Sequence, residues 1–397
     1  MTTENSTNKK SPLVLFMASF FPNRVYPVKG PFIRNFADVV SREYPLVVLT
    51  AEADENQPGF WGIEKTQHAG FEQYTVYYNH KRVKIPVIRS FVNFLSFFRG
   101  TLKAYKMIVK EHGQVGIHHL HSSLPMGIVA LYLKWIKGKP YVFSEQVTIY
   151  IFERFKQLSF FKKSLHKAIF RNASGISGLT HYHADEIAKC GLASHIEVIP
   201  NVIDTTHYGE GSASKSGDRI HWVHMSTLSP VKGVDDQIRA LALVVAKGYN
   251  VEFTIIGGNP ERIAELYVLS ESLGVADRVV WKGWMARDQF VPIMQQSHLF
   301  LLNSEFETFC VVAAEALACG LPVVCPSIGP LKEFIHEKNG VFFEERNPQH
   351  IADAAIRCMQ QLNQYHAQKI VAETESKFGP EKVLHLFGQL YTKLPGQ

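Results

Sequence analysis

The sequence predicts an α/β protein of two doubly wound parallel-sheet domains, Rossmann-like in pattern, that face a central cleft. Three observations indicate this architecture. The chain has 397 residues, more than one hydrophobic core usually organises, so two domains of about 200 residues each are expected. Short apolar runs alternate with longer helical patterns in both halves, as in parallel sheets with crossover helices. A glycine- and serine-rich stretch typical of a linker separates the halves.

The short apolar runs are the expected strands. In the first half they are 13–19, 46–51, 116–121 and 141–145, and in the second half 219–226, 251–257, 278–283, 298–304 and 321–326. In open parallel sheets, ligands bind where the carboxyl ends of the strands meet, and a cleft between two such domains is the expected binding site.

The domain boundary is expected within the segment VIPNVIDTTHYGEGSASKSGD. Pro200 and Asn201 interrupt the strand-helix pattern there, and residues 209–217 have the composition of a linker. This places the first domain at 1–205 and the second at 206–378. Residues 379–397 have the pattern of an amphipathic helix that packs back on the first domain.

Composition restricts the class of protein. No apolar run approaches the roughly 18 residues that a membrane-spanning helix needs, and the first residues are polar, which predicts a cytoplasmic protein. The five cysteines form no C-x-x-C pair and indicate buried thiols rather than a disulfide framework. The net charge of +6 favours attraction to an anionic ligand or lipid surface over nucleic-acid binding.

The stretch SEFETFCVVAAEALACGLPVV, residues 304–324, carries two carboxylates. Glu307 lies in the turn after an expected strand, and Glu315 is the one carboxylate in an apolar helical run. A buried carboxylate is costly unless it is paired or hydrogen-bonded, so Glu315 needs a partner. Each residue also has an ordinary structural explanation, Glu307 as a carboxylate beside the helix dipole and Glu315 as half of a buried salt bridge.

The same turn predicts an anion site. Phe309, Cys310 and Val311 would supply free backbone N–H groups at the start of the helix, where phosphate oxygens bind readily.

This stretch resembles the signature of the GT4-type retaining glycosyltransferases of GT-B fold. The signature is Glu, seven residues, Glu, then Ala, small residues, Gly320, Pro322 and two valines, and further landmarks follow in order over nearly the whole chain. The resemblance implies that Glu307 contacts the hydroxyls of the donor sugar and that Glu315 contacts the ribose of the nucleotide. The carboxylate in the apolar helix would then accept hydrogen bonds from sugar hydroxyls.

A second landmark is HMSTLSPVKGVDDQIRA, residues 224–240. Lys232 matches the family lysine that neutralises the donor diphosphate, a role suited to a compact ammonium charge. The alternative is a solvated loop lysine.

The chain departs from the family pattern just before this loop. Family members often have Gly-Arg where this chain has Ser226 and Thr227, so one cation for the diphosphate is missing and Thr227 is a secondary donor contact. Developing negative charge is what such a site must stabilise. Arg24 and Lys29 are the candidates to replace the cation.

In the first domain, the resemblance implies roles for Gly30 and His121. Gly30 precedes an amphipathic helix and allows close backbone approach to a phosphate. His121 matches the second histidine of a family pair that faces the donor sugar, and with Glu307 it is a predicted catalytic residue. His119 is the substitute, and a structural histidine is the alternative for either. A metal site at HHLH, residues 118–121, is disfavoured because no nearby carboxylate or cysteine completes a ligand set.

Three further residues are secondary candidates. Asn201, in VIPNVID, lies at the family's domain junction, where a turn role is equally open. Trp284 and Met285, in WKGWM, follow the strand end where the family contacts the nucleobase, mostly through the backbone.

Two segments of the first domain mix aromatic and basic residues, 89–110 and 152–171. An amphipathic basic helix lies on anionic lipid, which suits a lipid-linked acceptor and peripheral contact with the inner membrane face. The alternative, which we favour from sequence alone, is that the aromatic residues are core and the lysines face solvent.

Taken together, the residues and the resemblance predict a retaining glycosyltransferase of bacterial surface polysaccharide or glycolipid synthesis. It would move a hexosyl group from a nucleotide diphosphate sugar to a glycan or lipid-linked acceptor, with no metal and no cofactor. The sequence does not indicate which nucleobase or sugar the donor carries, or which acceptor is used. The rival is a sugar-nucleotide-binding scaffold without turnover. An oxidoreductase lacks support because no G-x-G-x-x-G follows an early strand.

Overall fold

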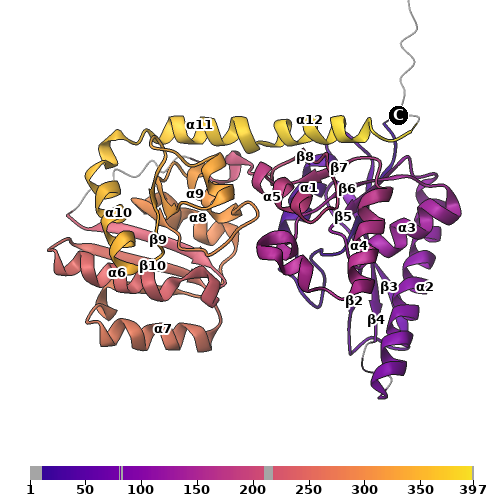
Figure 1. Ribbon diagram of the computed structural model, residues 1–397, viewed down its shortest axis with the longest axis horizontal. Helices are drawn as coiled ribbons and strands as arrows, with labels where there is room; N and C mark the ends of the chain where they lie inside the picture. The colour runs from indigo at the N-terminus through magenta and orange to yellow at the C-terminus, as the bar shows by residue number, and fades with distance from the viewer. Residues whose placement is uncertain (1–10, 80, 82–83, 210–217, 396–397) are drawn as a thin grey trace, which may run out of the picture. The chain divides into compact units, whose positions relative to one another are not determined.

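A computed structural model describes residues 11–79, 81, 84–209 and 218–395 of the chain (Figure 1). They form two compact units. Unit 1 comprises Met1–Leu179, His183–Asn201 and Val383–Gln397, and unit 2 comprises Thr180–Tyr182 and Val202–Lys382. The division falls close to the domain boundary predicted from the sequence, and most of the predicted linker, residues 210–217, lies outside the described residues.

Unit 1 is built on an eight-stranded sheet with the order β3-β4-β2-β1-β5-β6-β7-β8. All neighbouring strands are parallel except β3 and β4, which form an antiparallel pair at one edge. The strands are β1 (Val14–Ala18), β2 (Leu46–Ala53), β3 (Trp61–Gln67), β4 (Phe71–Tyr78), β5 (Ile117–His121), β6 (Tyr141–Ser144), β7 (Ile176–Gly178) and β8 (Glu197–Val198).

Helices cover both faces of this sheet. They are α1 (Pro31–Val40), α2 (Pro86–His112), α3 (Met126–Lys137), η1 (Thr148–Gln157), α4 (Phe160–Asn172), α5 (His181–Lys189) and α12 (Pro380–Tyr391). α2 and α3 contribute to the core on one face. On the other face, the Phe387 ring of α12 packs against Phe36 of α1 and His119 of β5, with ring centroids 5.0 and 5.2 Å apart. The predicted C-terminal amphipathic helix is therefore α12, and its apolar side completes the core of unit 1.

Unit 2 has a six-stranded parallel sheet with the order β11-β10-β9-β12-β13-β14. The strands are β9 (Ile220–Ser226), β10 (Val251–Gly257), β11 (Val279–Lys282), β12 (Leu299–Leu301), β13 (Val323–Pro326) and β14 (Gly340–Phe343). The helices are η3 (Pro230–Lys232), α6 (Val234–Ala246), α7 (Pro260–Ser272), α8 (Arg287–Gln296), α9 (Val311–Ala318), α10 (Pro348–Gln360) and α11 (Ala367–Phe378).

The predicted fold class, two doubly wound parallel-sheet domains, is confirmed, and each run predicted as a strand contains one. The pattern missed β3, β8 and β14, which lie at sheet edges, β7, which has 3 residues, and β4, an interior strand of 8 residues that mixes polar and apolar side chains. Among the described residues, no helix combines the length and the apolar character needed to cross a membrane.

Candidate active site

Two loops meet at the carboxyl edge of the unit 2 sheet. One follows β9 and contains Lys232, and the other follows β12 and contains Glu307. The backbone N–H of Glu305 donates to the carbonyl of Val231 over 2.8 Å, which ties the loops together. As a result, the Lys232 ammonium lies 2.6 Å from Glu307 Oε1. The structure thus brings together two side chains that the sequence predicted separately as donor contacts.

Gly233 allows this approach. It adopts the left-handed conformation with φ of 58° at the end of η3 and the start of α6. A Cβ at this position would lie 2.4 Å from Asn303 Nδ2 and 2.8 Å from Asn303 O. Only glycine therefore lets the lysine loop lie against the end of β12.

Lys232 remains cationic despite its limited exposure. Burial acts to lower the pKa of its ammonium, but the charge of Glu307 and the hydrogen bond between the two side chains act in the opposite direction, and the pKa is raised overall. The pair is partly accessible, with 21% of the lysine side chain and 14% of the glutamate side chain exposed. A fixed cation and a fixed carboxylate thus lie side by side within reach of solvent.

The start of α9 lies directly after this carboxylate. Cys310 caps the helix in a left-handed conformation, with φ of 78°, and Phe309 and Cys310 have buried side chains. The backbone N–H groups of Phe309, Cys310 and Val311 donate to no residue in the described part of the chain. The first turn of α9 therefore keeps the unpaired donors that the sequence predicted for an anion.

Glu315 has a protein partner that the sequence did not indicate. The hydroxyl of Tyr208 donates to Glu315 Oε1 over 2.6 Å, and both residues are buried. Burial raises the pKa of the Glu315 carboxyl, while the Tyr208 hydrogen bond and the charge of Arg287 counteract this rise in part. The predicted partner of Glu315 is therefore a hydrogen-bond donor, Tyr208, rather than the cation of a salt bridge.

We expect the replacement Glu315→Gln to flatten the pH dependence of stability. The folded carboxyl holds its proton more tightly than the unfolded one, so the free energy of unfolding falls as the pH rises from the ordinary carboxyl pKa to the raised one. Glutamine keeps an oxygen for Tyr208 but has no titrating proton. Urea unfolding at a series of pH values should show a smaller decline in the variant than in the wild type. An equal decline would show that Glu315 does not titrate in this range.

Tyr208→Phe is the companion variant. It removes the hydroxyl that stabilises the ionised carboxylate, so the decline with rising pH should become steeper than in the wild type. Unchanged pH dependence would mean that the hydrogen bond contributes nothing to the ionisation of Glu315.

Near Thr227, where the family often has arginine, lies a cation that the sequence did not predict. Thr227 is exposed, and its hydroxyl lies 3.0 Å from that of Ser229. The guanidinium of Arg262, on α7, donates from Nε to the carbonyl of Leu228, the residue after Thr227, and is paired with Asp235 and Glu265. Sequence reasoning missed Arg262 because it lies outside the loop motif.

Arg24 and Lys29, the predicted replacements, belong to unit 1 and are both engaged there. Arg24 forms ion pairs with Asp54 and Glu64, each at 2.7 Å, and Lys29 pairs with Glu52 at 2.7 Å. Both cations are paired within unit 1, as Lys232 is with Glu307 in unit 2, and their role as replacements for the arginine stays a prediction.

The nucleobase candidates lie on the surface after β11. Trp284 is 63% exposed and Met285 is partly exposed. No hydrogen bond orients the indole among the described residues, so this segment presents a free aromatic face.

In unit 1, Gly30 and Asn201 lie at the carboxyl edge of the sheet. Gly30 starts α1 in a left-handed conformation, with φ of 65°, and a Cβ there would approach the backbone of Phe20 to 3.0 Å. Asn201 follows β8 and is 4% exposed, and its side-chain oxygen has no hydrogen-bond partner in the described part of the chain. Both positions stay candidates for ligand contact.

The structure gives His121 the surroundings of a core histidine. As predicted, His119 and His121 share one face of β5, but His121 is 0% exposed. Its ring lies 4.1 Å from that of Phe16 and 6.5 Å from that of Phe387 on α12. Burial and the neighbouring His119 hold the pKa of His121 well below its usual value. Both ring nitrogens of His121 are buried and have no hydrogen-bond partner in the described part of the chain, and its contact with the donor sugar stays a prediction.

His119 is not a substitute, because its two ring nitrogens already have protein partners. They lie 3.1 Å from the hydroxyl of Tyr391 and 2.8 Å from that of Ser144. His118 points to the opposite face and contacts the Tyr105 hydroxyl at 3.1 Å. His118 and His119 therefore have separate partners on the two faces of β5, while the His121 ring lies 4.0 Å from that of His119.

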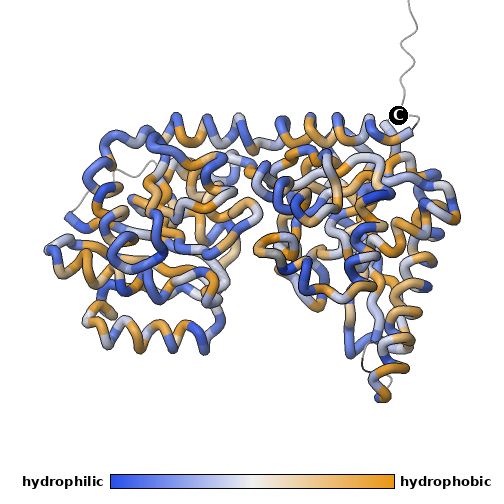
Figure 2. Tube along the Cα trace, in the orientation of Figure 1, coloured by the Kyte–Doolittle hydropathy of each residue, from blue (hydrophilic) through white to orange (hydrophobic). Residues whose placement is uncertain are grey.

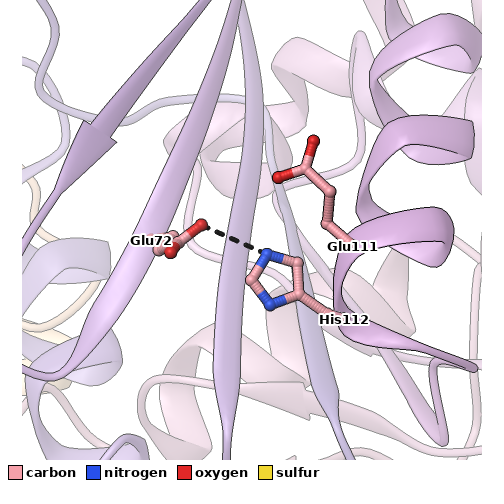
Figure 3. A group of neighbouring side chains, drawn as sticks. All are labelled: Glu72, Glu111 and His112. Carbon is pink, nitrogen blue, oxygen red and sulfur yellow. Dashed lines mark ion pairs between the residues drawn. The ribbon is translucent and has the colours of Figure 1, made fainter.

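A different cluster, Glu72, Glu111 and His112, gathers metal-type ligands at the other end of unit 1 (Figure 3). His112 Nε2 lies 3.1 Å from Glu72 Oε2. The ammonium of Lys65, however, lies 2.8 Å from an oxygen of each glutamate, and these hydrogen bonds lower the pKa of both carboxyls. Since a protein cation already neutralises the pair, the cluster is explained as an ion-pair network.

Comparison with known proteins agrees with this geometry. Residues 211–374 match the family described as glycosyl transferases group 1, and residues 37–207 match glycosyltransferase family 4. The chain belongs to the GT4-type glycosyltransferases of GT-B fold. Unit 2, with Lys232, Glu307 and Glu315, corresponds to the first match, and most of unit 1 to the second.

Among curated GT4-type relatives, N-acetyl-alpha-D-glucosaminyl L-malate synthase of Bacillus anthracis is 28% identical over 172 residues, 43% of this chain and 44% of that protein. A GDP-mannose-dependent alpha-(1-6)-phosphatidylinositol monomannoside mannosyltransferase of Mycobacterium tuberculosis is 28% identical over 185 residues, 43% of this chain and 48% of that protein. The matched segments span less than half of either relative.

Solved GT-B structures match over nearly the whole chain. Sucrose-phosphate synthase from Thermosynechococcus elongatus has a TM-score of 0.76 at 18% identity, covering 96% of this chain and 98% of that one. Anabaena HepE in complex with UDP and glucose has a TM-score of 0.71 at 18% identity, covering 97% and 100%. At this identity the likeness establishes the fold.

Proposed function

We propose that the protein is a retaining glycosyltransferase that moves a sugar from a nucleotide diphosphate sugar to an acceptor hydroxyl, and that it requires no metal. One observation carries the proposal. The Lys232–Glu307 pair lies beside the unpaired N–H groups of α9 at the carboxyl edge of a parallel sheet. This arrangement provides positive potential for a diphosphate and a carboxylate for sugar hydroxyls in adjacent positions.

Each group then has a chemical role in donor binding. Lys232 exchanges its contact with Glu307 for the diphosphate, and the N–H groups of Phe309, Cys310 and Val311 bind phosphate oxygens. Glu307, released from the lysine, accepts hydrogen bonds from the donor sugar. Glu315 accepts hydrogen bonds from the ribose, in competition with or in addition to that from Tyr208.

The chemistry that we propose proceeds on one face of the sugar. The bond between the anomeric carbon and the leaving phosphate breaks as the acceptor oxygen approaches from the same side, and the leaving phosphate takes the proton of the acceptor hydroxyl. Lys232 and the α9 N–H groups stabilise the charge that develops on the phosphate. Analysis of the product by NMR should show the anomeric configuration of the donor, and an inverted product would contradict the mechanism.

The acceptor would bind in unit 1. A polar cavity of about 800 Å³ lies at the ends of β1 and β2, and its lining includes Arg24, Tyr26, Asp54, Asn56 and Lys81. Carboxylates, amide groups and cations together provide acceptors and donors for a hydroxyl-rich molecule such as a glycan. A role in surface polysaccharide or glycolipid synthesis is consistent with relatives named for phosphatidylinositol-linked acceptors.

A sugar-nucleotide-binding scaffold without turnover is the second candidate, because Thr227 stands where the family often has arginine. Thermal unfolding with UDP, GDP and ADP at equal concentration tests donor binding. A ligand at a hundred times its dissociation constant adds about 2.7 kcal/mol to the free energy of unfolding. We expect one nucleotide to stabilise the protein clearly more than the others, as a base-specific donor site requires.

The sugars of that nucleotide can then be screened for transfer. Stabilisation without transfer for any of them would favour the scaffold. No stabilisation by any nucleotide would contradict the donor site itself.

A further inference from the structure

The N-terminal part of α2 projects from unit 1 with apolar side chains in solvent. α2 has 27 residues, compared with 12 in α3 and 13 in α4, and at about 1.5 Å per residue it is roughly 40 Å long. Its first buried residue is Ser96. The part before Ser96 extends past the neighbouring helices (Figure 1).

This projecting part carries large apolar residues that pack against little else. Their exposed fractions are 59% for Ile85, 82% for Val87, 48% for Ile88, 65% for Phe91 and 45% for Phe94. We call these five residues the apolar tip; Figure 2 colours this end of the helix largely as hydrophobic. Scattered apolar residues are normal on a protein surface, but a contiguous group of this size marks an interaction site.

The sequence next to the apolar tip is basic. Lysine or arginine occurs at 81, 82, 84 and 89, and no acidic residue occurs from Lys81 to Lys110. Lys81 forms an ion pair with Glu55, and the basic residues at 99, 103, 106 and 110 lie along the rest of α2. Arg89, within the tip, donates to the carbonyl of Lys84 over 2.7 Å, so it stays beside the apolar side chains. A basic helix with exposed aromatic and aliphatic residues matches the boundary between anionic headgroups and acyl chains.

A second exposed aromatic pair occurs at the start of α4. Phe160 and Phe161 are 85% and 76% exposed and precede Lys162 and Lys163. Both α2 and α4 follow strands of the parallel part of the sheet, β4 and β6, and therefore begin at its carboxyl edge. The exposed aromatic and basic residues of the two helices thus occur at the same edge of unit 1.

We propose that unit 1 docks on an anionic lipid bilayer through the apolar tip of α2, with Phe160 and Phe161 of α4 as a second contact. The complementary charge of the surrounding lysines and arginines favours anionic lipid over a neutral membrane or a second copy of this basic surface. The docking goes beyond the transfer reaction and does not depend on the donor site, which is formed by unit 2.

Sedimentation with lipid vesicles tests this docking on the full chain. The protein should sediment with vesicles of phosphatidylglycerol and phosphatidylcholine, much less with phosphatidylcholine alone, and less again as salt rises. The variant Val87→Ser/Phe91→Ser should lower the vesicle partition coefficient at least about tenfold, because it removes two of the most exposed apolar side chains of the tip.

The chain offers a matched control. Trp135 and Ile136, in the last turn of α3, are 59% and 62% exposed but lie at the opposite edge of the sheet. Trp135→Ser/Ile136→Ser removes as many exposed apolar residues and should leave vesicle binding unchanged. Equal loss in both variants, or none in the tip variant, would overturn the proposal. Light scattering without lipid gives a further test. If the tip variant differs from the wild type in oligomeric state, the tip binds a second copy and the proposal is overturned.

Stabilisation by nucleotide separates this inference from the proposed function. The tip variant should keep the nucleotide response of the wild type, since the tip lies in unit 1 and the donor residues in unit 2. Vesicle binding without any nucleotide response would leave the docking surface standing and contradict the donor site. Nucleotide response without vesicle binding would support the donor site and contradict the docking surface.

Discussion

Replacing Glu307 by glutamine is expected to lower the rate of sugar transfer at least about a hundredfold, the loss typical for removal of one oriented polar group from an active site. The carboxylate lies 2.6 Å from the Lys232 ammonium. In the donor complex we propose that it accepts hydrogen bonds from the sugar, and a neutral amide accepts them more weakly. Transfer is measured as labelled product from the nucleotide sugar identified by the thermal screen.

Folding should survive this change because Glu307 lies in a partly exposed turn outside the hydrophobic core. Glu305→Gln is the matched control, since Glu305 is two residues away, is exposed, and contributes to the loop contact through its backbone N–H. The control should transfer sugar at the wild-type rate. Equal turnover by Glu307→Gln and the wild type would show that the donor sugar binds elsewhere.

Lys232→Met should remove most of the affinity for the diphosphate. Methionine keeps an apolar stem but has no charge, and a hydrogen bond to a charged group contributes about 1.5–3 kcal/mol, which corresponds to roughly a tenfold to a hundredfold loss of affinity. The loss should be larger for the nucleoside diphosphate than for the monophosphate of the same base, because the ammonium acts on the diphosphate. Isothermal titration with both nucleotides measures the difference.

Lys247→Met is the control for this variant. Lys247 follows α6 and forms an ion pair with Asp353 at 3.0 Å on the surface, so its loss changes the net charge equally without touching the candidate site. It should bind both nucleotides as the wild type does. If Lys232→Met weakens the monophosphate and the diphosphate by the same factor, Lys232 does not contact the diphosphate selectively.

The sequence by itself was sufficient to predict most of the central strands of both sheets. Strands such as β1 and β10 are almost continuously buried, so they appear as apolar runs between helical patterns. β3 gives no such run because it is partly or fully exposed along its length. β4 is mostly buried, but Glu72, Gln73 and Thr75 interrupt its apolar residues. β7 and β8 have 3 and 2 residues, too few for a periodic signal.

The local parts of the candidate site were also predictable. Glu307, the start of α9 and Glu315 lie within one short segment of the chain. A strand-turn-helix pattern is therefore enough to predict their order and their elements. The same kind of pattern after β9 is enough to place Lys232 and Gly233 in the loop before a helix.

Only the tertiary structure decided which residues meet. Lys232 and Glu307 are 75 residues apart, and Tyr208 and Glu315 are 107 residues apart, with no sequence signal joining either pair. Strand alternation correctly placed His119 and His121 on one face of β5, but it could not say what covers that face. The cover is α12, whose Phe387 packs on both rings. Sequence patterns report local periodicity, whereas enclosure of a side chain depends on a segment that joins it from far along the chain.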